Sequence, residues 1–116
     1  MLISRDFKFD AAHYLPSYKG KCERLHGHTY KLRVTLEGEV GAEGMICDFA
    51  EIKRVVSENV LDELDHNDLN KVIPVPSAEN IAVWIWGRID GKFGIAKLKE
   101  VSVWETENCS VAYGGK

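Results

Sequence analysis

The stretch HTYKLRVTLEGEV, residues 28–40, alternates between apolar and polar side chains until Gly38 interrupts the pattern. The members of the apolar phase are His28, Tyr30, Leu32, Val34 and Leu36. Successive side chains of a strand point to opposite faces of a sheet, so this period of two predicts a strand with one buried face. The segment LISRDFKFDAAH, residues 2–13, has the same period, and His13 lies in its apolar phase. We therefore expect two half-buried strands at the start of the fold.

Two helices and two further strands are predicted after this pair. In DFAEIKRVVSENVLDEL, residues 48–64, apolar side chains recur at helical spacing, and Asp48 with Glu51 resembles a capping box. These apolar positions are Phe49, Ile52, Val56 and Val60. The segment SAENIAVWIWGRI, residues 77–89, predicts a second helix, capped by Ser77 and ending near Gly91. Residues 98–107, LKEVSVWETE, alternate again, and SVAYG, residues 110–114, predicts a short last strand.

This order of elements predicts an α+β fold in a single domain over residues 1–116. Strands that follow one another in pairs favour a four-stranded antiparallel sheet with both helices on one face. A sheet of this size has two open edges, and open edges tend to pair with another chain. We therefore expect self-association.

The composition limits the class of protein. The chain has 116 residues, 45% of them hydrophobic, which suffices for one core. Its net charge of −3 and the lack of a long basic run argue against a nucleic-acid partner. No apolar run could cross a bilayer, and MLISRDFKFD lacks a signal-peptide core, so we expect a cytoplasmic protein without a membrane partner. Three widely spaced cysteines make a poor disulfide framework, and the apolar surroundings of Cys47 and Cys109 predict core positions.

Three of the four histidines fit one metal site. His26 and His28 point to the same face of a strand, and His13 ends the preceding strand in its apolar phase. If these strands pair, the three imidazoles converge. Three histidines with an open fourth position are typical of catalytic zinc, whereas structural zinc fills all four positions with protein ligands. The alternative is three unrelated histidines, two of which flank a turn glycine.

The thiol in CERLHGH, residues 22–28, has three possible roles. Lys19, Lys21 and Arg24 surround Cys22 and would favour its thiolate, which makes it a candidate nucleophile or base. Cys22 could equally be a fourth zinc ligand or a buried, inert thiol. The sequence alone does not separate these interpretations.

Two carboxylates complete the candidate residues. Asp65 directly precedes His66 at the end of the first predicted helix, where it could orient the imidazole for proton transfer, although such a pair is more often a solvated helix end. Glu105 is in phase with Val101 and Val103 and so faces the core, where a carboxylate needs a partner. That partner is either a lysine or arginine, or the paired N–H donors of a bound 2-amino-4-oxo heterocycle.

Six segments, taken together, resemble the 6-pyruvoyltetrahydropterin synthase/6-carboxytetrahydropterin synthase family over nearly the whole chain. They are FDAAHYL, CERLHGHTYKL, GMICDF, LDHNDLN, PSAENIA and VSVWETENCSVAY. The resemblance implies the tunnelling fold, with strand–strand–helix–helix–strand–strand order, whose sheets close into a barrel in trimers that stack into hexamers. Ser77 stands where many relatives have threonine, and Thr29 where many have asparagine. Both keep a hydrogen-bonding side chain.

The resemblance also implies roles for individual residues. His13, His26 and His28 become zinc ligands, and Cys22 becomes a catalytic thiol beside the metal. Asp65 and His66 complete a proton relay that reaches the site from a neighbouring subunit. Glu105 and Thr106 anchor the pterin ring. The anionic triphosphate of the substrate needs a local basic patch in this acidic protein, for which Lys19, Lys21 and Arg24 are the candidates; the alternative is a solvated loop.

The family's substrate is 7,8-dihydroneopterin triphosphate. One branch releases 6-pyruvoyltetrahydropterin, and the other cleaves the side chain to give 6-carboxy-5,6,7,8-tetrahydropterin and acetaldehyde on the route to 7-deazaguanine nucleosides such as queuosine. Three residues, ERL, separate Cys22 from His–Gly–His, and this spacing is that of the carboxy branch. A zinc-stabilised binding or assembly module, with Cys22 as fourth ligand, remains the non-enzymatic alternative.

Overall fold

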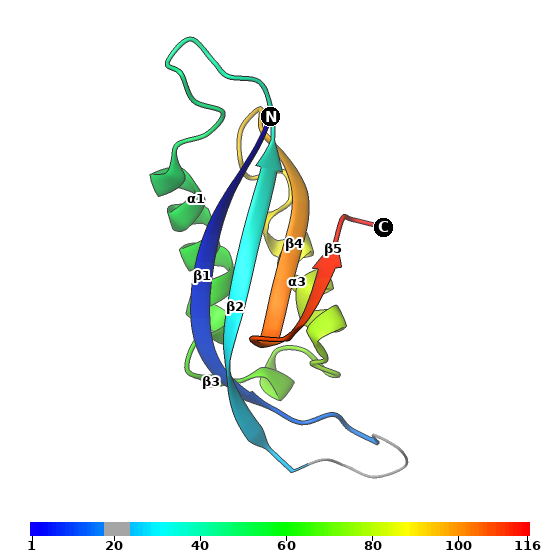
Figure 1. The fold of residues 1–116 in the computed structure, drawn as a ribbon. Helices are drawn as coiled ribbons and strands as arrows, with labels where there is room; N and C mark the ends of the chain where they lie inside the picture. Colours follow the sequence, from blue (N-terminus) through cyan, green and yellow to red (C-terminus); the bar gives the residue numbers. More distant parts are fainter. Residues whose placement is uncertain (18–23) are drawn as a thin grey trace.

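A single five-stranded sheet with helices on one face forms the architecture (Figure 1). The structure, a computed structural model, describes residues 1–17 and 24–116. The strand order is β3-β1-β2-β4-β5, with β1 (Leu2–His13), β2 (His26–Glu37), β4 (Lys97–Thr106) and β5 (Cys109–Tyr113) joined in antiparallel pairs. These are the four strands predicted from the alternating segments, so the α+β prediction is confirmed.

The fifth strand, β3 (Asn67–Asp68), was not predicted. It pairs parallel to β1, with Ala11 opposite Asn67, so a purely antiparallel sheet is wrong at this edge. Two residues are too few to leave a periodic pattern in the sequence, and only the path of the chain after the first helix brings them to β1.

The first predicted helix is three consecutive helical segments: α1 (Phe49–Val56), the π-helical η1 (Ser57–Leu61) and α2 (Asp62–Leu64). Asp48 caps α1 by accepting from the Ala50 N–H at 2.8 Å. The reciprocal half of the capping box is absent, because the Glu51 carboxylate binds Arg54 instead. Phe49 is 52% exposed, which corrects the prediction that it faces the core.

The second helix, α3 (Ala78–Ile89), begins and ends close to the predicted residues. The Ser77 hydroxyl accepts from the Asn80 N–H at 3.1 Å, and the helix closes at Asp90. Gly91 follows in the left-handed region, with φ of 80°. The short 3₁₀ helix η2 (Leu69–Lys71) links β3 to the loop before α3.

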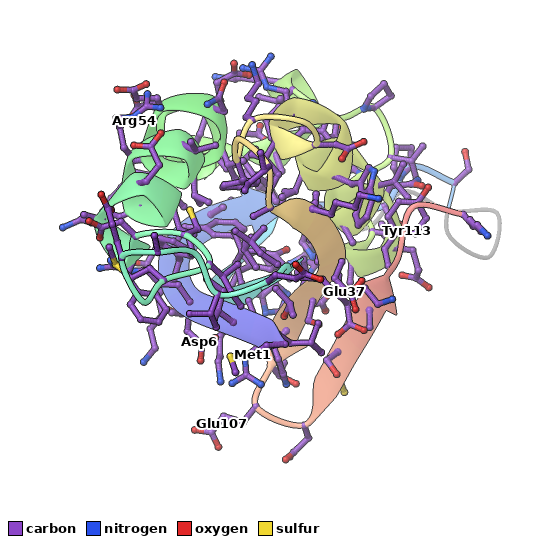
Figure 2. All side chains as sticks on the ribbon, turned by 90° about the horizontal axis from the view of Figure 1, so that it is seen from above. Met1, Asp6, Glu37, Arg54, Glu107 and Tyr113 are labelled. Atoms are coloured by element: carbon purple, nitrogen blue, oxygen red, sulfur yellow. The ribbon has the colours of Figure 1, made fainter. Side chains whose placement is uncertain are left out.

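The core fills the space between the sheet and the helices (Figure 2). It takes its side chains from the predicted apolar phases of the strands and from the inner faces of the helices, among them Phe9, Leu32, Ile52 and Ile85. The other face of the sheet is not covered by helices, and Asp6 and Glu107 point away from them. We call this the outer face of the sheet.

The described cysteines differ in their environments. Cys47 is half-buried against the core, and burial raises the pKa of its thiol, with the nearby Glu51 and Asp48 adding to the effect. Cys109 is exposed, so the prediction of a core position is wrong. It begins β5, which is an edge strand of the sheet.

No helix among the described residues is long and apolar enough to cross a membrane.

Ser77→Ala should lower the free energy of unfolding by about 1 kcal/mol, because the Asn80 N–H loses its cap. Chemical denaturation measures the change. Ser77→Thr is the matched control, and it should stay near the wild-type value because threonine offers the same acceptor. Equal losses in both variants would contradict a capping role.

Candidate metal and active site

The pairing of β1 with β2 brings three histidines together. His13 lies opposite His26, and Ala11 lies opposite His28, so all three rings project on the helix-covered face of the sheet. The distances between ring centroids are 4.7 Å for His13–His26, 5.1 Å for His13–His28 and 4.9 Å for His26–His28. One nitrogen of each ring lies within 4.8 Å of the others. The predicted convergence of these imidazoles is therefore present in the fold.

Backbone carbonyls fix the orientation of two of these rings. His13 Nδ1 lies 2.7 Å from the Pro76 carbonyl oxygen, and His26 Nδ1 lies 2.9 Å from the Arg24 carbonyl oxygen. A carbonyl oxygen only accepts, so both Nδ1 atoms carry the proton and both Nε2 atoms present lone pairs in the neutral rings. Those Nε2 atoms face each other at 3.1 Å. Two lone pairs at this distance repel unless a cation lies between them.

This arrangement fits a shared metal ion. Tetrahedral zinc with Zn–N distances of about 2.0–2.1 Å places neighbouring ligand nitrogens about 3.3 Å apart, close to the observed separation. Carbonyl oxygens that hold the second nitrogen of a ligand histidine are the usual outer partners of a metal-bound imidazole. His13 is 2% exposed, so its position varies little. The donor set is suited to zinc, and the three residues can supply three of its four ligands.

Glu105 lies beside this cluster because it is in phase with Val101 and Val103 of β4, which face the helices. The β4–β5 register shifts between Trp104 and Thr106, which leaves Glu105 as the extra residue on β4. The Glu105 carboxylate lies 3.5 Å from His28 Nε2, and 32% of the side chain is exposed. Glu105 is thus half-buried at the site rather than fully inside the core, and it lies against a histidine rather than a lysine or arginine.

Tyr30 is a second polar group at this end of the core. Its ring packs edge-on against His13 and His28, and the side chain is fully buried. Among the described residues its hydroxyl has no hydrogen-bond partner. Burial, and then the negative charge of Glu105, raise the pKa of Tyr30, so the phenol stays protonated and is available only as a hydroxyl.

Asp65 and His66 form a second cluster with two residues that sequence reasoning did not select for it. His66 Nδ1 lies 3.0 Å from Asp65 Oδ1, and that oxygen also accepts from the Asp10 N–H at 3.0 Å. The Thr29 hydroxyl donates to Asp10 at 2.5 Å. Asp10 left no signal in the sequence, because a polar residue on the exposed phase of a strand is ordinary.

The two clusters lie on opposite faces of the sheet. Asp10 and Thr29 pair directly across β1 and β2 and alternate with Ala11 and His28, so their side chains project on the outer face. An open hollow of about 540 Å³ adjoins this second cluster. Its lining residues are Asp10, Ala11, Ala12, Gly27, His28, Thr29, His66 and Asn67. A Cβ at position 27 would lie 3.7 Å from the Ala11 carbonyl oxygen, an ordinary contact distance. A larger side chain than that of Gly27 would therefore fit here without moving the backbone.

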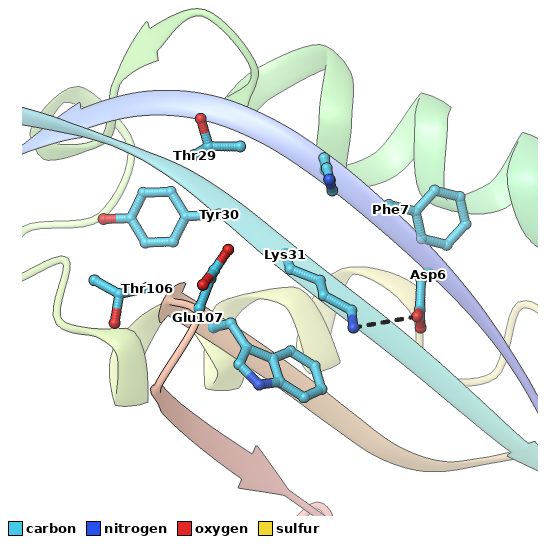
Figure 3. Close-up of a pocket in the computed structure, with 9 residues that line it drawn as sticks. Asp6, Phe7, Thr29, Tyr30, Lys31, Thr106 and Glu107 are labelled. Carbon is cyan, nitrogen blue, oxygen red and sulfur yellow. Dashed lines mark ion pairs between the residues drawn. The ribbon is translucent and has the colours of Figure 1, made fainter.

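The remaining predicted residues are only partly placed. Thr106 lines a larger pocket of about 730 Å³, in which Lys31 lies between Asp6 and the ring of Trp104 (Figure 3). Arg24 is exposed, and its carbonyl oxygen accepts a hydrogen bond from His26 Nδ1. The predicted residues Lys19, Lys21 and Cys22 lie outside the described residues.

The comparisons with known proteins agree with this fold. Residues 2–116 match the family described as 6-pyruvoyl tetrahydropterin synthase, and the chain belongs to that family. The solved structure of 6-pyruvoyl tetrahydropterin synthase from Caenorhabditis elegans superposes with a TM-score of 0.87 at 31% identity, covering 100% of this chain and 96% of that one. The chain therefore has the tunnelling fold of a pterin synthase-type enzyme.

The relatives carry different names within the family. A dihydroneopterin monophosphate aldolase from Pyrococcus furiosus is 47% identical over 84% of this chain and 82% of its own length. A 6-carboxy-5,6,7,8-tetrahydropterin synthase from Synechocystis is 37% identical over 97% and 92%. The human 6-pyruvoyl tetrahydrobiopterin synthase is 35% identical over 98% and 91%. All three cover most of the chain, so membership of the family does not by itself select a reaction.

His26→Ala should abolish stoichiometric zinc binding, because two nitrogens cannot replace the three-imidazole set. Elemental analysis of purified protein measures the metal content. His66→Ala is the control and should keep one zinc per chain, since that ring belongs to the cluster on the outer face. Loss of zinc in the control, or its retention in His26→Ala, would place the metal elsewhere.

Proposed function

We propose that this protein is a zinc-dependent 6-carboxy-5,6,7,8-tetrahydropterin synthase, a lyase that acts on 7,8-dihydroneopterin triphosphate. One water is consumed, and the products are 6-carboxy-5,6,7,8-tetrahydropterin, acetaldehyde and triphosphate. The observation that carries the proposal is the convergence of His13, His26 and His28, with Nε2 lone pairs facing one point and Glu105 beside them. The three-residue spacing between Cys22 and His26 and the similarity to the Synechocystis synthase support the carboxy branch.

Each group has a chemical role in this proposal. His13, His26 and His28 would hold a zinc ion, which would supply a Lewis acid that makes C–H protons of the substrate side chain more acidic. Cys22, as thiolate, removes such a proton, and His66, oriented by Asp65, transfers protons to and from the substrate. Glu105 accepts two hydrogen bonds from the ring N–H and exocyclic amine of the pterin. Thr106 at the end of β4 contributes a hydroxyl, and Lys19, Lys21 and Arg24 receive the triphosphate.

The proposed site needs two subunits. The Asp10 carboxylate beside His66 projects on the outer face and the metal-binding rings on the helix-covered face, so we infer that one chain does not direct both at one substrate. The short β3 and the edge strand β5 leave backbone groups available for pairing with other copies. We infer that the 1–116 domain assembles as a trimer or hexamer in which a neighbouring subunit supplies Asp65 and His66.

A second candidate is retro-aldol cleavage of a dihydroneopterin monophosphate, which the similarity to the Pyrococcus furiosus aldolase favours. That reaction removes the proton of the second side-chain hydroxyl and breaks the bond between the first two side-chain carbons. The electron pair of the broken bond passes into the pterin ring, and a proton is then added at the first side-chain carbon. The products are a 6-hydroxymethyl pterin and a two-carbon aldehyde phosphate. A Lewis acid and a proton-transfer pair serve both reactions.

The deciding experiment offers the zinc-loaded protein dihydroneopterin triphosphate and dihydroneopterin monophosphate separately and identifies the products by mass spectrometry. Acetaldehyde and 6-carboxytetrahydropterin from the triphosphate support the first proposal. A two-carbon aldehyde phosphate from the monophosphate supports the aldolase, and 6-pyruvoyltetrahydropterin supports the pyruvoyl branch. If the zinc-loaded oligomer converts neither substrate, the result supports the non-enzymatic alternative, a binding or assembly module.

Glu105→Gln should lower kcat/KM for the pterin substrate by about 30- to 1000-fold, which corresponds to about 2–4 kcal/mol of transition-state binding. The amide keeps the shape of the side chain but sets an N–H against an N–H of the pterin. Steady-state kinetics give the loss, and zinc content and thermal stability should stay at wild-type values. Near-wild-type kcat/KM would make Glu105 a structural partner of His28 only.

Mixing inactive Cys22→Ala and His66→Ala proteins should restore activity if the site is shared. Random exchange at an equal ratio gives an intact site wherever a His66→Ala subunit supplies Cys22 and its neighbour supplies His66, about one quarter of all sites. Activity is measured before and after exchange, with exchange itself followed by mass spectrometry. No recovery after complete exchange would mean that each site is built within one chain.

A further inference from the structure

The cluster around Asp65 and His66 contains a second carboxylate, that of Asp10, which has no part in the proposed mechanism. A carboxylate oxygen of Asp10, one of Asp65 and a ring nitrogen of His66 all lie within 4.8 Å of one another. Asp65 Oδ1 accepts from both the Asp10 N–H and His66 Nδ1. Because a carboxylate only accepts, Nδ1 carries the proton, and Nε2 is the atom of the neutral ring that can take one up. The His66 side chain is 79% exposed at the hollow on the outer face, so a substrate can reach Nε2.

The position of Asp10 is fixed from three sides. Its N–H binds Asp65, its carbonyl accepts from the His66 N–H at 2.6 Å, and its carboxylate accepts from the Thr29 hydroxyl at 2.5 Å. The first two contacts use the backbone and would survive a change of side chain. The contact with Thr29 uses the carboxylate itself and holds it over the β1–β2 pair, next to Asp65 and His66.

This arrangement gathers negative charge around the His66 ring. Two carboxylates within 4.8 Å repel each other, and aspartate is depleted in strands. His66 adds a left-handed backbone, with φ of 57°, which is uncommon for a residue other than glycine. Strained backbone and like charges of this kind gather at functional sites, where the strain supports the chemistry. An imidazolium at His66 would relieve the repulsion between the two carboxylates.

We propose that Asp10, held by Thr29, is a positioning residue of the proton relay: its carboxylate stabilises the positive charge that the His66 ring acquires when Nε2 takes up a proton. The proton moves from the substrate to Nε2 and the Nδ1–H stays on Asp65, so the ring becomes an imidazolium between two carboxylates until it returns the proton. The titratable groups that line this hollow are Asp10 from β1, His28 from β2 and His66 itself, and Asp65 lies behind the His66 ring. The proposal rests on the role of His66 in the proposed function.

The test compares kcat and KM in the zinc-loaded protein with the pterin substrate that the wild type converts. Asp10→Asn keeps an acceptor for Thr29 but removes the charge, and should lower kcat about tenfold with KM and zinc content within about twofold of wild type. Thr29→Val, which lacks the donor, should lower kcat less, and Thr29→Ser should restore it. Asp6→Asn is the matched control, an aspartate of the same strand and face that is paired with Arg33, and should leave kcat unchanged.

The His66→Ala background separates a role through His66 from a structural one. Asp10→Asn should cause no further loss of kcat there, because the charge it stabilises can no longer form. A tenfold loss in both backgrounds, or wild-type kcat for Asp10→Asn, would overturn the proposal while the pterin reaction stands. A wild-type protein that converts neither pterin substrate refutes the proposed function instead, and a fully active His66→Ala variant refutes the relay from which this inference starts.

Discussion

The register between β1 and β2 is the constraint on which the rest of the site depends. Twelve consecutive residue pairs fix it, and it places His13 opposite His26 and Ala11 opposite His28. A slip of one residue would move every side chain of a strand to the other face, which would expose the apolar phase and separate the imidazoles. The buried phase of both strands therefore holds the candidate metal site in place, since the hydrophobic core and the histidines share one register.

The carbonyls that orient two of the histidines come from one distant and one local segment. The carbonyl of Pro76, next to the cap of α3, orients His13 across 63 residues of sequence, whereas the carbonyl of Arg24 orients His26 locally. These contacts fix the tautomers and leave both Nε2 lone pairs pointing at one position. The start of α3 is thus a structural element of the metal site as well as a helix end. The helix packs on the sheet through Ile81 and Ile85, and this packing holds the carbonyl in place.

The alternation of strands divides the chemistry between two faces. Asp10 and Thr29 alternate with Ala11 and His28, so the relay around His66 and the metal-binding rings belong to the same pair of strands but point in opposite directions. In the proposed assembly, pairing with other copies of the chain brings them together, and the open edges of the sheet provide the backbone groups for it. Glu105 of β4 lies on the same face as the histidines, and its carboxylate is 3.5 Å from His28 Nε2.

The sequence by itself determined the elements and their faces, because periods of two and of 3.6 residues are local properties of the chain. Four strands, two helical regions, both helix caps and the common phase of His13, His26 and His28 were predicted from it, and the resemblance to the pterin synthases identified the family. Only the tertiary structure decided the parallel β3, the bulge at Glu105, the Pro76 carbonyl that orients His13, and the place of Asp10 beside Asp65 and His66. Each of these depends on contacts between residues far apart in the chain or on a register shift, and neither leaves a periodic pattern in the sequence.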